Sequence, residues 1–167
     1  MELKVKKTQK EEVDYLAEIE NTSFEVNAKY FEKGVLPPLP HEDVDKYSFK
    51  VLCEQSDTET LTIFYEDEII GGVIVKDIEP KTKEVLLFFI APKMQGKNWG
   101  QKALKMVENM YPETRIWRLV TPTQVLRNSV FYINKCGYSI VRVDEWDKEK
   151  ECGMFVFEKK CEGNEND

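Results

Sequence analysis

The stretch from Val85 to Leu104 constrains the fold of this chain more than any other. It opens with an unbroken apolar run, residues 85–91, which is too short for a buried helix and is rich in residues that favour strands. Because the run does not alternate, both faces of the strand should be buried. Gly96 and Gly100 follow in a turn, and apolar residues then recur at helical spacing. A strand, a glycine loop and a helix start bring together free N–H groups and the positive end of a helix dipole, which predicts an anion site, typically for a phosphate.

The segments next to this stretch predict how the central strand pairs. Three strand-like segments, residues 60–65, 68–75 and 85–91, are separated by short turns, so an antiparallel meander is expected. The helical segment 99–110 then leads to a strand at 116–120. A strand, a helix and a strand in this order predict a parallel pair joined by a right-handed crossover.

The rest of the chain predicts a single domain, residues 1–160, followed by a polar tail, residues 161–167. We expect a mixed α/β fold with a mostly antiparallel central sheet of about seven strands flanked by about four helices. Further strands are expected at 2–7, 49–54, 138–144 and 153–158, and further helices from a Thr8–Glu11 capping box to about Asn21 and at 27–33. A last helix ends at Cys136 and begins either at a cap within residues 121–124 or at Asn128.

Composition excludes several classes of function. A net charge of −7 argues against a nucleic-acid partner held by phosphate contacts. No apolar run reaches membrane-spanning length and the N-terminus lacks the apolar core of a signal peptide, so no membrane partner and a cytoplasmic location are expected. The four cysteines lack metal-ligand spacing and the only histidine is His41, so we expect reduced thiols and no metal site.

The glycine loop distinguishes between kinds of phosphate site. A P-loop needs Gly-x-x-x-x-Gly-Lys-Ser/Thr, which is absent, and a dinucleotide fold places its glycines after the first strand. The segment Gln95-Gly-Lys-Asn-Trp-Gly100 instead resembles the GNAT superfamily of acyl-CoA-dependent N-acyltransferases, whose loop reads Gln/Arg-x-x-Gly-x-Gly/Ala. Gln95 and Gly100 match, whereas Asn98 stands at a position where the family has glycine. Asparagine tolerates a positive φ better than most residues.

A second segment, Asn128 to Tyr138, is similar to the late helix of that family, and the resemblance covers residues 61–158. It implies the GNAT fold and acetyl-CoA as co-substrate, without a metal. The loop amides would hold the CoA pyrophosphate, and the end of the central strand would pair with the pantetheine where two parallel strands splay apart. The cofactor-binding residues implied are Phe89, Ile90, Ala91, Gln95, Gly96, Lys97, Asn98, Trp99, Gly100, Gln101 and Asn128.

Two of these residues also have a purely structural interpretation. Asn128 either bonds the pantetheine or caps its helix. Trp99 falls on the apolar stripe of the helix and is expected in the core.

The resemblance also implies catalytic residues. Glu84 precedes Gln95 by eleven residues, the spacing of the base glutamate in the histone-acetyltransferase branch, although a solvated glutamate at a strand end would look the same. Tyr132 matches the acid tyrosine by residue type, or is one more aromatic residue of an amphipathic helix. Phe24, Glu25 and Phe31 lie in the segments that wall the acceptor site in this family.

The sequence therefore predicts an N-acyltransferase that transfers an acetyl group from acetyl-CoA to a primary amine by direct attack in a ternary complex. The acceptor is a small-molecule amine or a protein amine, and a homodimer is possible because dimers are frequent in the family. The alternative is a non-catalytic acyl-CoA-binding regulatory domain of the same fold, and a third interpretation is an interaction module without a nucleotide.

Overall fold

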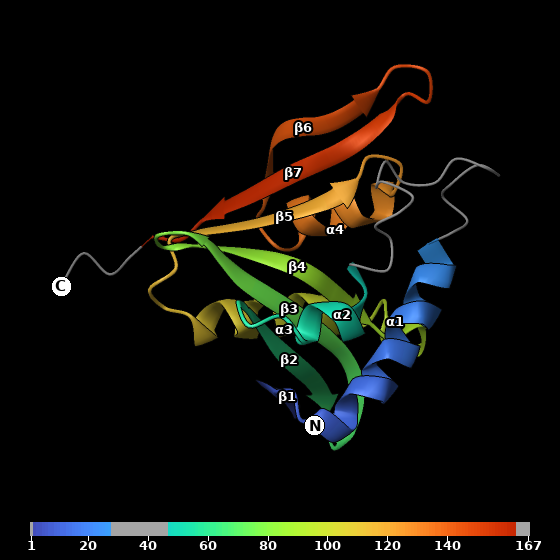
Figure 1. Cartoon of the computed structure of the whole chain (residues 1–167), viewed down its shortest axis with the longest axis vertical. Helices are drawn as coiled ribbons and strands as arrows, with labels where there is room; N and C mark the ends of the chain where they lie inside the picture. Colours follow the sequence, from blue (N-terminus) through green and yellow to red (C-terminus); the bar gives the residue numbers. More distant parts are fainter. Residues whose placement is uncertain (1, 28–46, 163–167) are drawn as a thin grey trace.

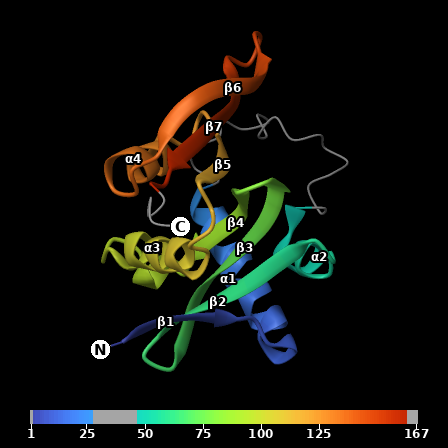
Figure 2. The ribbon, with the colours of Figure 1, turned by 90° about the vertical axis from the view of Figure 1, so that its left-hand side faces the viewer.

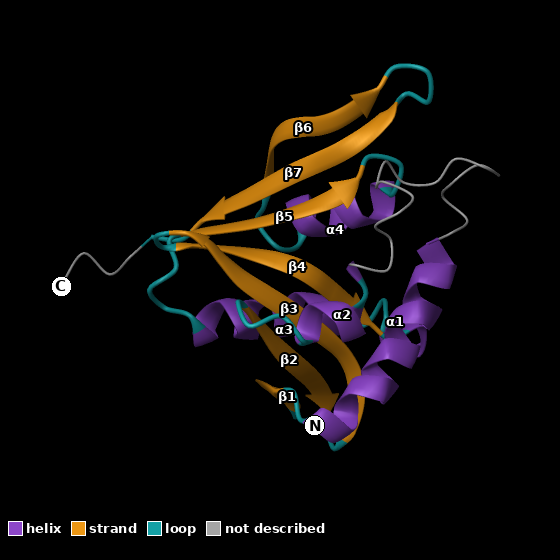
Figure 3. Cartoon of the chain, viewed as in Figure 1, coloured by secondary structure: helices purple, strands orange, loops and turns teal. Residues whose placement is uncertain are grey.

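The computed structural model describes residues 2–27 and 47–162. Seven strands form one sheet in the order β1-β2-β3-β4-β5-β7-β6, with helices on both faces (Figures 1 and 3). The strands are β1 Leu3–Lys7, β2 Thr58–Tyr65, β3 Glu68–Glu79, β4 Thr82–Ile90, β5 Ile116–Pro122, β6 Ser139–Asp147 and β7 Cys152–Lys160. The helices are α1 Val13–Asn27, α2 Phe49–Cys53, α3 Trp99–Met110 and α4 Leu126–Asn134, with 3-10 turns at Lys10–Glu12 and Pro92–Met94.

The strand pairing confirms the predicted meander and crossover. Strands β1 to β4 pair antiparallel with their neighbours, and β4 pairs parallel with β5 through the crossover helix α3. Strand β7 then pairs antiparallel with both β5 and β6. The sheet is therefore mostly antiparallel, with a single parallel pair at its centre.

That central pair is short. The β4–β5 ladder runs only from Thr82↔Ile116 to Val85↔Leu119, although β4 continues to Ile90 and β5 to Pro122. Beyond the ladder the two strands diverge, as Figures 1 and 3 show. The second half of β4 therefore has backbone groups that no neighbouring strand satisfies on the β5 side, which is the opening expected from the sequence.

The helices divide between the two faces of the sheet. Figure 2 shows α3 and α4 on one side and α1 and α2 on the other. A Cβ added at Gly72 would meet Leu16 of α1 and Phe49 of α2, whereas Phe88 stacks on Phe131 of α4 at 6.2 Å between ring centroids. Buried apolar residues from both layers form one core cluster, and their burial supplies the main driving force for folding.

The segment 49–54 is helical, so the predicted strand there is wrong. Helix α2 begins after Ser48, whose side chain accepts a hydrogen bond from Val51 N–H. Phe49 and Leu52 are buried and lie three residues apart, which is the spacing of one helix face. The apolar run alone cannot distinguish this pattern from a strand, whereas the N-cap serine is a helix signal.

Other element ends also differ from those predicted. The capping box uses Gln9 and Glu12, with Gln9 N–H donating to Glu12 Oε2 at 3.0 Å, one residue later than the predicted pair. Helix α1 continues to Asn27, and α4 spans residues 126–134 instead of ending at Cys136. The predicted helix at 27–33 falls almost wholly outside the described residues. Within residues 2–27 and 47–162, no helix is long and apolar enough to cross a membrane.

Candidate active site

Two residues of the loop between β4 and α3 have a positive φ, the conformation that glycine adopts most easily. Gly96 has φ +75°, and Asn98, the N-cap of α3, lies in the left-handed region at φ 63°, ψ 9°. Asparagine is one of the few residues with a side chain that adopts this conformation routinely. Asn98 therefore takes the turn for which the family pattern uses glycine.

This turn leaves a row of free N–H groups at the start of α3. Lys102 N–H donates to the Asn98 carbonyl as the first helical bond, and no side chain caps the helix. In the described part of the chain, the N–H groups of residues 96–101 donate to no turn or cap acceptor. Free donors at a helix N-terminus attract an anion, and the helix dipole adds to that attraction.

Two cations of α4 reach this loop, and the sequence did not single them out. Arg127 donates to the side-chain carbonyl of Gln95, and Lys135 Nζ donates to Asn98 Oδ1 at 2.9 Å. Gln101 Nε2 donates to the Lys135 carbonyl at 2.8 Å. Helix α4 is thus tied to the loop at both of its ends, and two positive charges flank the free N–H groups beside exposed Lys97.

At the end of β4 a carbonyl group faces the opening. Ala91 N–H donates to Ile70 on β3 at 2.7 Å, and in a trans peptide the carbonyl of the preceding residue points the opposite way. The Ile90 carbonyl therefore points away from β3. It accepts hydrogen bonds from Ser23 Oγ of α1 at 3.0 Å and from Gln95 Nε2 at 2.8 Å.

The residues on either side of Ile90 are buried. Phe89 is buried and meets Phe49 edge-on, with 5.6 Å between ring centroids, and Ala91 is buried as well. The Trp99 ring lies tilted against Tyr65, with 4.6 Å between ring centroids, and borders the core cluster. The side chain therefore has a packing role, and the indole Nε1 is buried without a hydrogen-bond partner among the described residues. The backbone N–H of Trp99 remains free at the loop.

The junction of β5 and α4 holds buried polar groups without partners. Among the described residues, neither side-chain amide atom of Gln124 has a hydrogen-bond partner, nor has the hydroxyl of Ser129. Asn128 Nδ2 donates to Thr121 Oγ1 at 3.2 Å. Buried polar groups without partners are uncommon in native proteins and point to a missing bonding group. No sequence pattern marked Gln124 or Ser129.

Glu84 lies on β4 between two cations. Its direct register partners are Lys76 on β3 and Arg118 on β5, so the three side chains share one face of the sheet. Trp117, the residue before Arg118, meets Tyr111 at the end of α3, so Glu84 faces the opposite side, that of α1 and α2. Burial raises the pKa of the Glu84 carboxyl, against the opposing effects of Arg118, Lys76 and Arg142.

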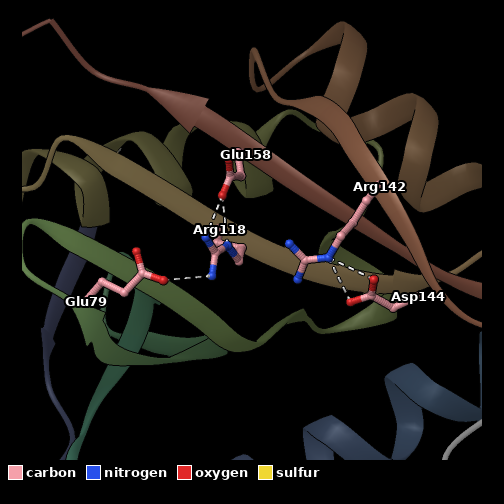
Figure 4. A network of polar contacts seen from close by, with 5 residues as sticks. All are labelled: Glu79, Arg118, Arg142, Asp144 and Glu158. Atoms are coloured by element: carbon pink, nitrogen blue, oxygen red, sulfur yellow. Dashed lines mark hydrogen bonds and ion pairs between the residues drawn. The ribbon is translucent and has the colours of Figure 1, made fainter.

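Neither neighbouring cation bonds to Glu84. Arg118 donates to Glu158 through Nε at 2.9 Å and Nη2 at 2.8 Å, and Lys76 pairs with Asp57 at 2.7 Å. Among the described residues, no hydrogen bond or ion pair reaches the Glu84 carboxylate. Figure 4 shows the Arg118–Glu158 pair with Glu79 beside it. Glu84 is thus half-buried, surrounded by charge and unpaired.

The predicted acid, Tyr132, lies on the buried side of α4. Its ring centroid is 5.7 Å from that of Phe157 of β7 and 6.0 Å from that of Tyr138. Only 9% of the residue is exposed. Burial raises the pKa of its phenol well above the ordinary value, so the hydroxyl keeps its proton at neutral pH.

The predicted acceptor residues lie at the end of α1 as far as they are described. Phe24 is 46% exposed, Glu25 is exposed on the same helix, and Phe31 lies outside the described residues. The turn of α1 before them carries buried Glu20, which accepts a hydrogen bond from Phe49 N–H at 2.9 Å. Burial raises the pKa of the Glu20 carboxyl.

The comparisons with known proteins agree with this geometry. The model of the acetyltransferase (GNAT) family matches residues 14–138. The chain belongs to the GNAT acetyltransferase family. A curated relative, the uncharacterized protein YrkN of Bacillus subtilis, is 35% identical over 80 residues, which are 47% of this chain and 43% of that protein. The chain thus matches less than half the length of that relative.

Solved structures show the same GNAT fold. The PaiA N-acetyltransferase of Thermoplasma acidophilum, in complex with coenzyme A, superposes with a TM-score of 0.69 at 22% identity, covering 96% of this chain and all of that one. The ribosomal-protein-S18-alanine N-acetyltransferase of Escherichia coli has a TM-score of 0.69 at 8% identity, covering 99% and 98%. At these identities the likeness establishes the fold of the chain.

The residues of this GNAT acetyltransferase fit a coenzyme A molecule. The loop presents N–H donors and nearby cations, which suit a pyrophosphate. The Ile90 carbonyl is an acceptor, and the unpartnered side-chain amide of Gln124 offers both a donor and an acceptor. These groups suit the two amides of a pantetheine arm. The fit therefore rests on the free loop N–H groups and the unpartnered Gln124 amide of this chain as well as on the family.

Proposed function

We propose that this chain is an N-acetyltransferase that transfers an acetyl group from acetyl-CoA to a primary amine. One observation carries the proposal. The β4–β5 ladder stops after Val85↔Leu119, and the opening that follows ends at a loop with free N–H groups at residues 96–101. A strand edge without a partner that leads to an anion site suits an extended ligand with a phosphate end.

In this proposal the loop amides bind the pyrophosphate, with Lys97, Arg127 and Lys135 as nearby cations. The Ile90 carbonyl accepts from one amide of the pantetheine, and Gln124, Asn128 and Ser129 line its path. Because Ser23 and Gln95 already donate to that carbonyl, at least one of these side chains turns aside when the ligand binds. Strand β4 thus acts as one half of a β-type pairing.

The acetyl thioester supplies an activated acyl group, and the chain supplies the proton transfers. Glu84 is the proposed base, which takes a proton from an ammonium or from water; its lack of a bond among the described residues and its position on the side of α1 and α2 support this role. Tyr132 keeps its proton at neutral pH and is the proposed donor to the departing thiolate. The acceptor is a small amine or a protein amine, with Phe24, Glu25 and Phe31 as the proposed wall of its site.

The position of Tyr132 keeps a second candidate function open. Its ring packs between α4 and β7, as a core aromatic does. A GNAT domain that binds acyl-CoA without transferring the acyl group would need no acid at this point. In that candidate the chain is a regulatory acyl-CoA-binding domain.

Isothermal calorimetry with CoA and a transfer assay with acetyl-CoA and a panel of amines separate the two functions. Free CoA is measured by chromatography, because the four cysteines of the chain would react with thiol reagents. Binding with amine-dependent CoA release supports the transferase, and binding without release for every acceptor class supports the regulatory domain. Absence of binding contradicts both.

Within the transferase, Tyr132→Phe tests the acid. We expect lower turnover with little change in CoA affinity, because the variant removes only the hydroxyl. Unchanged turnover across the pH range would assign Tyr132 to the core.

A further inference from the structure

A row of alternating charges crosses the sheet on the face that carries Glu84. Lys76, Glu84, Arg118 and Glu158 occupy successive strands β3, β4, β5 and β7 and are direct register partners. Directly opposed residues lie with Cβ atoms about 5 Å apart. Glu84 therefore has a lysine on one side and an arginine on the other, both within the reach of extended side chains.

Both cations are engaged elsewhere, but not equally firmly. The Arg118–Glu158 pair is mostly buried, with side chains 19% and 18% exposed, and it uses two guanidinium nitrogens. The Lys76–Asp57 pair is a single contact with side chains 33% and 56% exposed. Two-point guanidinium–carboxylate bonds are among the strongest in proteins, whereas exposed lysine pairs contribute little. Glu158 is thus the residue that fixes the orientation of the cation next to Glu84.

We propose that Glu158 is a positioning residue, which keeps Arg118 turned away from Glu84 and so leaves the Glu84 carboxylate free to take a proton. This inference rests on the proposed function, in which Glu84 is the base. Without Glu158, the Arg118 guanidinium would turn to half-buried Glu84, its register partner on β4, in preference to Glu79, which lies 4.0 Å away and is 62% exposed. A carboxylate clamped by arginine is a weaker base.

The charged groups that face Glu84 come from each neighbouring strand of the described chain. They are Lys76 on β3, Arg118 on β5, Arg142 on β6 and Glu158 on β7. Arg142 is itself held by Asp144, through Nε at 2.8 and 3.0 Å, and extends toward Arg118 (Figure 4). Each cation near Glu84 thus has its own carboxylate partner, and Glu84 is the one acid of the row without a cation.

The test is Glu158→Gln, with the titration of the Glu84 carboxyl carbon followed by NMR. We expect its midpoint to move to lower pH than in the wild type, and turnover at neutral pH to fall by no more than the roughly 100-fold loss expected for Glu84→Gln. The matched control is Glu79→Gln. It removes a carboxylate that lies 4.0 Å from the same guanidinium and is 62% exposed, so the midpoint should stay in place.

A double variant separates positioning from a merely structural role. In Glu158→Gln with Arg118→Met, the clamp is gone, so the Glu84 midpoint and turnover should return toward wild-type values. If Glu158→Gln does not fold, the titration of Glu84 is measured in the single variant Arg118→Met instead. It leaves the Glu158 carboxylate unpaired near Glu84, so the midpoint should move to higher pH.

An unchanged Glu84 midpoint in Glu158→Gln, or in Arg118→Met where only that variant folds, overturns the proposal. A double variant that stays as impaired as Glu158→Gln overturns it too. The NMR readout needs no activity, so its failure is distinct from failure of the proposed base role of Glu84, which full transfer by Glu84→Gln would reveal, and from failure of the transferase itself, which absence of amine-dependent CoA release would reveal.

Discussion

Substitution of Asn98 tests whether the left-handed turn at the start of α3 controls CoA binding. Valine at this position has a branched Cβ, for which φ 63° is a steric outlier. The left-handed conformation costs a residue with a Cβ about 1–2 kcal/mol, so its population falls by a factor of about 5–30. Apparent affinity scales with the population of the competent state, and we therefore expect Asn98→Val to weaken CoA binding by about 5–30-fold.

The matched control is Asn98→Gly. Both variants lose the side-chain bond from Lys135 to Asn98 Oδ1, but glycine adopts the turn without a steric cost. Calorimetric titration with CoA should therefore give a dissociation constant for Asn98→Gly that differs from the wild type only by the loss of that exposed bond. If Asn98→Val binds CoA as tightly as Asn98→Gly, the turn does not control the site and the reasoning is refuted.

Three further predictions concern stability. Gly71→Ala should destabilise the fold by about 1–3 kcal/mol in urea titrations, because its Cβ would lie 2.2 Å from the Phe89 carbonyl; unchanged stability would contradict this. Burial raises the pKa of Glu84 in the folded state, so the stability it contributes is complete below the unfolded pKa and is lost as pH rises through the folded pKa. Glu84→Gln should thus raise the melting temperature at about pH 8 and give little gain at about pH 4, and equal gains at both would reject the shift. Lys159→Met should cost about 3–5 kcal/mol, because it leaves Glu108, whose side chain is 4% exposed, unpaired. Adding Glu108→Gln should restore most of that loss, and no recovery would assign the effect to packing.

Local patterns predicted the central part of the fold. The unbroken apolar run at 85–91, the turns before it and the helical spacing after it are signals within one segment, and each matched an element. Segment 49–54 failed because its apolar residues suit either a strand or a helix. Only the cap at Ser48 distinguishes the two. Helix α4 lacks even that signal, since its N-cap is Val125 with no side-chain bond, and it begins between the two starts that the sequence allowed.

The missed parts of the candidate site depend on contacts between distant segments. Arg127 and Lys135 approach the loop from positions 32 and 37 residues away, and nothing near either residue marks it as a loop partner. The unpartnered state of Gln124 can be seen only once the surrounding atoms are placed. The glycine loop itself was predictable because its function depends on backbone shape, which a few adjacent residues encode.

The face on which Glu84 lies is decided by one extra residue in β4. Ile74 pairs with Leu87 and Val75 with Val85, so Leu86 has no partner of its own on β3. Without that insertion, alternation would put Glu84 on the same face as Phe88, which stacks on α4. With it, Glu84 shares the face of Phe89, which meets α2. The end of β4 therefore leads into the loop before α3, while the Glu84 carboxylate lies on the sheet face of α1 and α2. We propose that the amine arrives on that face. An inserted residue of this kind leaves no mark in an apolar run, so the face on which Glu84 lies was beyond what the sequence could specify.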